Sequence, residues 1–381
     1  MRGINGTLLF SDRKTARGES DKMPATITGW GHCVPPAVMT NDDIATFLDT
    51  NDEWIVERTG IKERRVSHVG SGELGKVAAL RALAAAGKSP DEVDAIIFAS
   101  VSPELLVPST ASIVQKRLGI EDVAAMDLNV GCSGFVYGLA LANGLISTGV
   151  AGCVLLVAAE RLTWYLDWTD RNTGVLFGDG SGAVVMEAGS DNEGVLAADL
   201  GNDGAAAGAL MVDNFGTAID RLDHDMLELT FNFDGREIFR RATKGMTRSA
   251  HAVLEQTGRT IDDVDLVIPH QANLRIIQAV GHKLGVGADK VYVNVNRYGN
   301  TSASSIPIAL SEALADGRID AGDLILMPAF GAGLSRGAAL LRWGDRVTPI
   351  ATSDAELPAS DATALDILRP VADAQIARAR T

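Results

Sequence analysis

Cysteine is scarce in this chain, and the few cysteines present lack the spacing of a metal site. The 381 residues include three, Cys33, Cys132 and Cys153. No Cys-x-x-Cys pair and no Cys/His cluster has the spacing of zinc ligands. An odd number in so large a chain implies no disulfide framework, and the usage predicts a reducing, cytoplasmic setting.

Positive charge is also in short supply. Lys and Arg number 34 against 49 Asp and Glu, which gives a net charge of −15. Nucleic-acid backbones and anionic membranes attract basic surfaces, so this balance argues against a general nucleic-acid binder and against adsorption to such membranes. An acidic partner would need a local basic patch.

Long apolar runs are missing as well. The longest, around Gly134–Ile146, is interrupted by Gly138, Asn143 and Gly144. It is too short to span a bilayer, and we expect a buried helix. Residues 1–22 are polar, lack periodicity and do not resemble a signal peptide, so we expect a flexible N-terminal extension.

What the chain does contain is an internal repeat. The segment Asp91–Ile97 resembles Asp262–Ile268, and each is followed by a helical stretch, a strand, a glycine-containing turn, a long apolar helix and two more strands. These elements are expected at Ala124–Val130, Ser133–Ile146, Cys153–Ala158 and Gly182–Glu187, and at Lys290–Val295, Ser302–Ala315, Leu324–Met327 and Gly337–Trp343. The repeat predicts two α/β halves, residues 23–190 and 191–344, each with a sheet covered by helices on both faces.

Residues 345–381 lie outside both halves. Their Pro, Asp and Ser content is typical of a linker, and Ala362–Ala379 is expected to form a short amphipathic helix interrupted at Pro370. The helix is expected to pack on the body or on a partner.

Cys132 is the strongest candidate nucleophile. It lies where a strand ends, a glycine-flanked turn follows and an apolar helix begins. Free N–H groups and the helix dipole at such a position favour the thiolate, which is the reactive form. The alternative is a small buried core cysteine, the interpretation that we favour for Cys33 and Cys153.

His270 and Asn300 lie in two further strand-to-helix turns. Side chains at the carboxyl ends of strands commonly form the active sites of α/β proteins. The alternatives are a hydrogen-bonded loop histidine and a helix N-cap. The glycine-rich loop Phe330–Leu334 could direct backbone N–H groups at an oxyanion, or could be only a tight turn.

At these residues the sequence resembles the β-ketoacyl-acyl-carrier-protein synthase III family of the thiolase-like superfamily. The resemblance extends from about Ile27 to Trp343. The sequence motifs on which the resemblance rests are, in order along the chain, Asn51–Ile61, Gly131–Phe135, Phe177–Gly180, Pro269–Ile276 and Gly299–Ala303. It implies an α/β duplicated thiolase-like fold layered α-β-α-β-α, and a homodimer.

The resemblance also implies a function in fatty acid biosynthesis. An acyl-CoA primer would load Cys132, and decarboxylative Claisen condensation with malonyl-acyl carrier protein would follow, with His270 and Asn300 stabilising the enolate. The backbone N–H groups of Cys132 and Ala332 would hold the oxyanion. No metal or redox cofactor is implied. The alternative is an acyltransferase or condensing enzyme of specialised metabolism that uses the same acyl-cysteine with a different acceptor.

Several binding residues follow from the resemblance alone. Coenzyme A and pantetheine contacts fall on Trp54, Arg58, Arg171 and Asn273, and carrier-protein docking falls on Arg240, Arg275 and Lys283. Val107 stands where many acetyl-starter members carry a bulky aromatic at the end of the acyl pocket, so its smaller side chain predicts a longer primer. Ala332 replaces a glycine that is frequent in the oxyanion loop.

Overall fold

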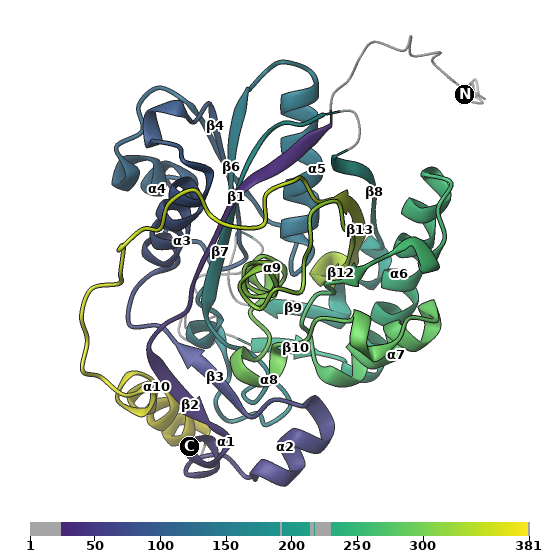
Figure 1. Ribbon diagram of the computed structural model, residues 1–381. Helices are drawn as coiled ribbons and strands as arrows, with labels where there is room; N and C mark the ends of the chain where they lie inside the picture. Colours follow the sequence, from purple (N-terminus) through teal and green to yellow (C-terminus); the bar gives the residue numbers. More distant parts are fainter. Residues whose placement is uncertain (1–23, 191–192, 214–216, 218–229, 380–381) are drawn as a thin grey trace, which may run out of the picture.

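The computed structural model describes residues 24–190, 193–213, 217 and 230–379, which form two sheets and the helices that cover them (Figure 1). The predicted N-terminal extension, residues 1–22, lies outside the described residues. The first sheet has five strands in the order β1-β7-β6-β4-β5. Their bounds are β1 Ala25–Cys33, β4 Ala95–Ala99, β5 Ala124–Leu128, β6 Cys153–Glu160 and β7 Gly180–Ala188.

The second sheet has four strands in the order β11-β12-β13-β8. Their bounds are β8 Gly194–Asn202, β11 Leu266–Val267, β12 Leu324–Gly331 and β13 Ser335–Arg342. Its pairing repeats that of the first sheet. β4–β6 and β11–β12 are parallel, whereas β6–β7, β7–β1, β12–β13 and β13–β8 are antiparallel. The two halves therefore share one topology.

One predicted strand of the second half does not form. Lys290–Val295 was expected to match β5, but it makes only an isolated parallel bridge between Val267 and Val291, and α8 (Val295–Tyr298) begins at its last residue. The neighbouring strand β11 has only two residues. An edge strand at residues 290–295 could form few backbone hydrogen bonds with so short a neighbour. Two backbone N–H groups of this segment donate to the side chain of Gln271 instead.

Helices separate and cover the sheets in five layers (Figure 1). The central layer contains α5 (Gly134–Ser147) and α9 (Ser305–Ala315), whose apolar side chains join both sheets in one core. One outer layer is α3 (Ser71–Ala86) with α4 (Thr110–Leu118), and the other is α6 (Gly235–Gln256) with α7 (Leu274–Leu284). Strands β4 and β6 are buried along their whole length because helices cover both faces.

A smaller region covers one end of the two sheets. It contains two antiparallel strand pairs, β2 with β3 and β9 with β10, together with two short helices. Their bounds are β2 Ala37–Thr40, α1 Asn41–Ala45, α2 Asp52–Thr59, β3 Glu63–Val66, β9 Leu210–Asp213 and β10 Thr230–Phe233.

The C-terminal segment packs on the body. It runs along α3, where the N–H groups of Ile350 and Ala351 donate to the carbonyls of Ala85 and Ala84. It ends in α10 (Ala364–Ala379), which lies beside β2 and β3 (Figure 1). The expected interruption at Pro370 is wrong, because α10 continues through this exposed residue.

Burial explains why the proline is tolerated. Ala364, Leu368 and Ala372 are buried on one face of α10, and Thr363 and Asp366 cap its first turn reciprocally. Together these contacts offset the one backbone hydrogen bond that a proline removes. Across the described part of the chain, no helix combines the length and the apolar character needed to cross a membrane.

Candidate active site

Cys132 lies in the turn between β5 and α5, two residues before the helix begins at Gly134. Gly131 adopts φ +57°, and a Cβ there would lie 2.5 Å from the backbone nitrogen of Ala332. Only glycine combines that dihedral with so close an approach. The predicted position of Cys132 at a helix N-terminus is therefore correct, and the turn is pressed against the loop after β12.

That loop brings a second backbone N–H to the cysteine. A Cβ on Gly331 would lie 2.4 Å from the Cys132 nitrogen, and Ala332 lines a cavity together with Cys132. The Ser335 hydroxyl donates to the carbonyl of Val130 at 2.8 Å and joins the two loops. Within this loop the left-handed φ, +124°, falls on Gly333, so Ala332 does not have to adopt it. The backbone N–H groups of Cys132 and Ala332 thus belong to two touching loops.

The electrostatic setting of Cys132 differs from the expectation. We expected the helix terminus to favour the thiolate, but burial raises the pKa of Cys132 to about 12, and the nearby hydroxyl of Ser302 offsets this only in part. Removing the thiol from water penalises its charged form more than the helix end stabilises it. Burial therefore favours the protonated form of the thiol at neutral pH.

His270 follows β11, and its backbone N–H donates to the carbonyl of Pro328 at 2.9 Å, which fixes it to the neighbouring strand β12. Its side chain is buried, and Nδ1 lies 2.8 Å from the hydroxyl oxygen of Ser305. Burial lowers the pKa of His270 to about 3. The imidazole is therefore neutral at physiological pH.

Asn300 lies in the turn between α8 and α9. Its backbone N–H donates to the carbonyl of Leu176 at 2.9 Å, and its carbonyl accepts from the N–H of Gly178 at 3.1 Å. Its side-chain oxygen accepts the N–H of Ser302 at 2.8 Å. This orients the amide group, because with its oxygen engaged Asn300 has its NH₂ left as the free donor.

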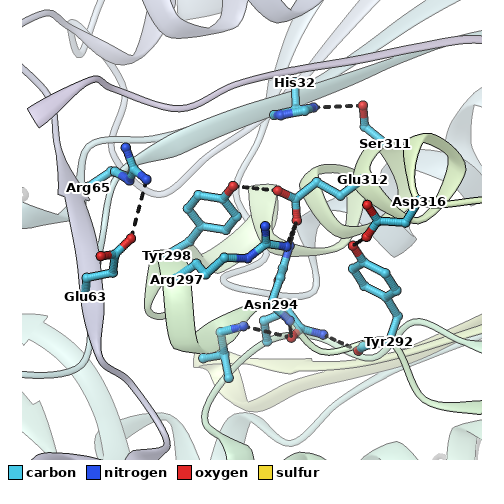
Figure 2. A network of polar contacts seen from close by, with 12 residues as sticks. His32, Glu63, Arg65, Tyr292, Asn294, Arg297, Tyr298, Ser311, Glu312 and Asp316 are labelled. Carbon is cyan, nitrogen blue, oxygen red and sulfur yellow. Dashed lines mark hydrogen bonds and ion pairs between the residues drawn. The ribbon is translucent and has the colours of Figure 1, made fainter. Parts of the chain in front are cut away.

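A largely buried polar network supports this turn from α9 (Figure 2). The carboxylate of Glu312 accepts from the side chains of Tyr298, Asn294 and Arg297. The amide of Gln271, next to His270, accepts the backbone N–H of Asn294 at 3.0 Å and donates to the carbonyl of Tyr292. The histidine and asparagine turns are therefore tied to one helix through a shared set of hydrogen bonds.

Cys132, His270 and Asn300 all line one narrow pocket of about 40 Å³. The turns that carry them are distant in sequence, and the fold brings them together as predicted. On one side, this pocket shares Leu176, Asn273 and other lining residues with a cavity of about 690 Å³. On the other, it shares Cys132 and Phe177 with a largely apolar cavity of about 260 Å³. Cys132 thus lies at the junction of a wide cleft and an apolar cavity.

The residues predicted to bind coenzyme A lie in or beside the wide cleft. Trp54, Arg58 and Asn273 line it. The guanidinium carbons of Arg58 and Arg171 lie 4.5 and 5.1 Å from the ring centroid of Trp54, so two cations contact one indole. Arg171 is not among the lining residues, and its side chain donates to the carbonyl of Asp49.

The residues predicted for carrier-protein docking belong to α6 and α7. Arg275 lines the wide cleft and is exposed. The Nζ of Lys283 lies 3.1 Å from the hydroxyl of Thr243, one turn beyond Arg240 on α6. Arg240 already forms an ion pair with Glu237 at 2.6 Å. The three cations therefore lie on adjacent helices, with one of their charges partly compensated.

Val107 does not line any of the cavities beside Cys132 in this chain. It lies on the loop before α4 and is 82% exposed, next to Leu106 at 80%. The expectation that Val107 closes the acyl pocket is therefore not met within a single copy.

Sequence reasoning missed two polar residues whose side chains influence the pKa of Cys132. Glu160, the last residue of β6, and Ser302, in the turn after Asn300, are both buried. Glu160 follows seven apolar or small residues of a strand, and Ser302 resembles an ordinary cap residue. Nothing local marks Ser302, whereas a carboxylate at the end of a buried strand is unusual enough to serve as a signal for Glu160.

Comparison with known families gives one consistent result. Residues 126–204 match the family described as 3-oxoacyl-[acyl-carrier-protein (ACP)] synthase III, and residues 254–343 match its C-terminal domain. The chain is 52% identical over 344 residues to β-ketoacyl-[acyl-carrier-protein] synthase III 2 of Vibrio cholerae, which covers 90% of this chain and 95% of that protein.

Solved structures agree in fold. The 3-oxoacyl-[acyl-carrier-protein] synthase III of Aquifex aeolicus superposes with a TM-score of 0.78 at 44% identity, over 84% of this chain and all of that one. The priming β-ketosynthase of the R1128 polyketide pathway superposes with a TM-score of 0.80 at 32% identity, over 86% of this chain and 99% of that one.

Proposed function

Because the chain belongs to the 3-oxoacyl-[acyl-carrier-protein] synthase III family and has a thiolase-like fold, we propose that it condenses an acyl-CoA primer with malonyl-acyl carrier protein through an acyl group on Cys132. It is an acyltransferase of the condensing type. The observation that carries the proposal is the pocket where Cys132, His270 and Asn300 meet between a wide cleft and an apolar cavity.

In the first half-reaction the sulfur of Cys132 attacks the primer thioester. The tetrahedral oxyanion accepts hydrogen bonds from the backbone N–H groups of Cys132 and Ala332, and coenzyme A leaves through the wide cleft past Trp54 and Arg58. An oxyanion donor of this kind lowers a barrier by about 3 kcal/mol. The acyl chain enters the apolar cavity, which contains Leu162, Phe177 and Phe231.

In the second half-reaction malonyl carrier protein delivers its thioester through the same cleft. Asn300 donates from its free NH₂ group, and His270 donates from Nε2. We assign the hydrogen to Nε2 because the Ser305 oxygen accepts the Gln271 N–H at 3.3 Å, which leaves its own hydrogen for Nδ1 of His270. These donors stabilise the enolate formed as carbon dioxide departs, and the carbanion attacks the acyl-cysteine.

The scheme uses neither a metal nor a redox cofactor, because the primer thioester and the acyl-cysteine thioester form and break without a change of oxidation state. Arg240, Arg275 and Lys283 provide the basic face for an acidic carrier protein on an otherwise acidic enzyme. We also propose a homodimer. The exposed apolar residues Leu105, Leu106 and Val107 support it, because in a dimer Val107 could close the acyl cavity of the second copy.

Intact-protein mass spectrometry after incubation with a series of acyl-CoA primers tests the acyl-cysteine. The expected result is one acyl adduct on the wild type and on the Cys33→Ala and Cys153→Ala variants, and none on Cys132→Ala. Carbon dioxide release from carboxyl-labelled malonyl carrier protein should then require the primer. A wild type that forms no adduct, or acyl transfer without decarboxylation, would contradict the proposal.

A further inference from the structure

The C-terminal helix α10 lies beyond the two regions that match the family, the second of which ends at Trp343. The condensation mechanism gives it no role. The helix packs beside β2 and β3, at the end of the molecule where α2 presents Trp54 and Arg58 to the wide cleft (Figure 1). Two of its polar side chains, Gln375 and Arg369, contact segments of chain that lead to that cleft.

Gln375 joins α10 to the segment 166–168. Its side-chain oxygen accepts the backbone N–H of Trp168 at 2.8 Å, and its Nε2 donates to the carbonyl of Leu166 at 3.1 Å. Within the described chain, these are the hydrogen bonds that join residues 166–170 to a part distant in sequence. Leu166 and Trp168 are buried, so loss of the amide would leave backbone groups of a buried segment without their partner.

The same segment continues directly to Arg171 and to the wall of the wide cleft. The side chain of Asp167 accepts the N–H of Thr169 at 2.8 Å, and that of Asp170 accepts the N–H of Asn172 at 2.9 Å. Carboxylates that bind the backbone two residues onward close tight turns. Asn172 lines the cleft. Two successive turns therefore connect the residues held by α10 to a cleft residue, with Arg171 between them.

Arg369 holds a second segment, the one between α1 and α2. Its guanidinium donates to the hydroxyl of Thr46 at 3.1 Å and lies 5.7 Å from the ring centroid of Phe47. The Phe47 ring packs edge-on against Trp168, with the ring centroids 5.9 Å apart and the planes at 75°. Helix α10 therefore contacts two segments that also pack against each other.

The two segments meet at Arg171. Its side chain donates to the backbone carbonyl of Asp49 at 3.2 Å, and its guanidinium carbon lies 5.1 Å from the ring centroid of Trp54. The ion pair with the Asp49 carboxylate, at 3.7 Å, is exposed to solvent and contributes little. The place of Arg171 over Trp54 therefore depends on where the two backbone segments lie, and α10 contacts both of them.

An indole flanked by two guanidinium groups has the chemistry of a nucleotide site. Arg58 and Arg171 are exposed, and their guanidinium carbons lie 4.5 and 5.1 Å from the Trp54 ring centroid. Aromatic rings and guanidinium planes stack on nucleobases, and guanidinium groups donate paired hydrogen bonds to phosphates. Coenzyme A carries an adenine and phosphate groups at the end remote from its thioester, so this end suits the exposed cations when the thioester is at Cys132.

We propose that α10 holds Arg171 over Trp54 and thereby sets how tightly the enzyme binds the nucleotide end of its acyl-CoA primer. The inference rests on the acyl-CoA primer proposed above. Gln375 and Arg369 are positioning residues, because neither is among the residues that line the wide cleft and both act through the backbone that carries Arg171. Helix α10 therefore affects the binding of coenzyme A esters and leaves the chemistry at the cysteine unchanged.

The test compares two thioesters of one acyl group, acyl-CoA and acyl-pantetheine, which lacks the nucleotide. Single-turnover acylation of the full chain, followed by intact mass, gives a maximal rate and a half-saturating concentration for each. In Gln375→Ala the half-saturating concentration of acyl-CoA should rise by about two- to fivefold, the size of a cation–π contact at an exposed site, with an unchanged maximal rate. Acyl-pantetheine should give wild-type values, because it does not extend to Arg171.

Arg171→Ala shows whether Gln375 acts through Arg171. In that background Gln375→Ala should cause no further change, because the contact that it positions is already lost. Arg369→Met loses the hydrogen bond to Thr46 and should also raise the half-saturating concentration of acyl-CoA alone. The matched control is Gln256→Ala, the same substitution at the exposed last residue of α6, which should leave the values for both thioesters unchanged.

Three outcomes would overturn the role of α10 and leave the proposed function intact. The first is an equal rise for both thioesters in Gln375→Ala, which would mean that the helix supports the whole cleft. The second is an additive effect of the two substitutions in Gln375→Ala/Arg171→Ala. The third is an unchanged half-saturating concentration of acyl-CoA in both Gln375→Ala and Arg369→Met. A wild type that forms no adduct with either thioester would instead refute the proposed acyl-cysteine.

Discussion

The side-chain oxygen of Asn300 accepts the backbone N–H of Ser302 at 2.8 Å, so the NH₂ group of Asn300 is the part left free in the pocket. Asn300→Asp should preserve this hydrogen bond and remove the donor. We expect primer loading to persist and condensation to fall by about a hundredfold or more, the usual loss on removing an oxyanion donor. Separate assays of acyl-enzyme mass and carbon dioxide release would measure the two steps. Equal losses in both steps would contradict this division of roles.

Buried His270 should make the protein sensitive to acid. Burial lowers its pKa from 6.5 to about 3, so between these values the unfolded chain binds a proton that the folded chain does not. The contribution of His270 to the free energy of unfolding is therefore fully present above about pH 6.5. Below that pH the free energy of unfolding falls, by about 2–3 kcal/mol at about pH 4.5.

Urea unfolding of the wild type and His270→Asn across this range measures the effect. The variant should lose less stability on acidification than the wild type. His251→Asn, at an exposed position on α6, should follow the wild type. Parallel curves for the wild type and His270→Asn would show that the imidazole is not held neutral.

Close contact between two loops should make Gly331 intolerant of a side chain. A methyl group there would lie 2.4 Å from the Cys132 nitrogen and 3.0 Å from that of Ser133. Gly331→Ala should therefore displace the oxyanion loop, destabilise the fold by about 1–3 kcal/mol and slow acylation. Thermal unfolding and single-turnover loading would report the two effects.

Gly144→Ala is the matched control for that substitution. Gly144 lies inside α5, and a Cβ there meets nothing within 4 Å among the described residues. We expect a stabilisation of about 0.5–1 kcal/mol from the improved helix propensity, with unchanged loading. A harmless Gly331→Ala would show that the two loops can separate.

Helix α10 should contribute to the stability of the whole fold, because Leu368 is 2% exposed and packs in the cluster that contains Ile55 and Trp168. Leu368→Ala should cost about 2–4 kcal/mol of unfolding free energy in chemical denaturation. Val150→Ala, at a site that is 71% exposed, should change it by less than about 0.5 kcal/mol. A neutral Leu368→Ala would mean that α10 docks too weakly to matter.

Much of this protein follows from local pattern. The repeated order of strands and helices, the turns that carry Cys132, His270 and Asn300, and the long buried helices follow from apolar periodicity and glycine placement, both of which act over a few residues. The layered fold, which the comparisons confirm, is the arrangement that lets two such halves bury their apolar faces.

Tertiary structure decided the rest, because burial and long-range contact leave no local mark. Residues 290–295 had a strand pattern but met a partner strand only two residues long, and Pro370 was tolerated because the opposite face of its helix is buried. The thiol of Cys132 lost the expected stabilisation of its charge when the fold removed it from water. Cys132 and His270, 138 residues apart, line one pocket only because their two halves pack together.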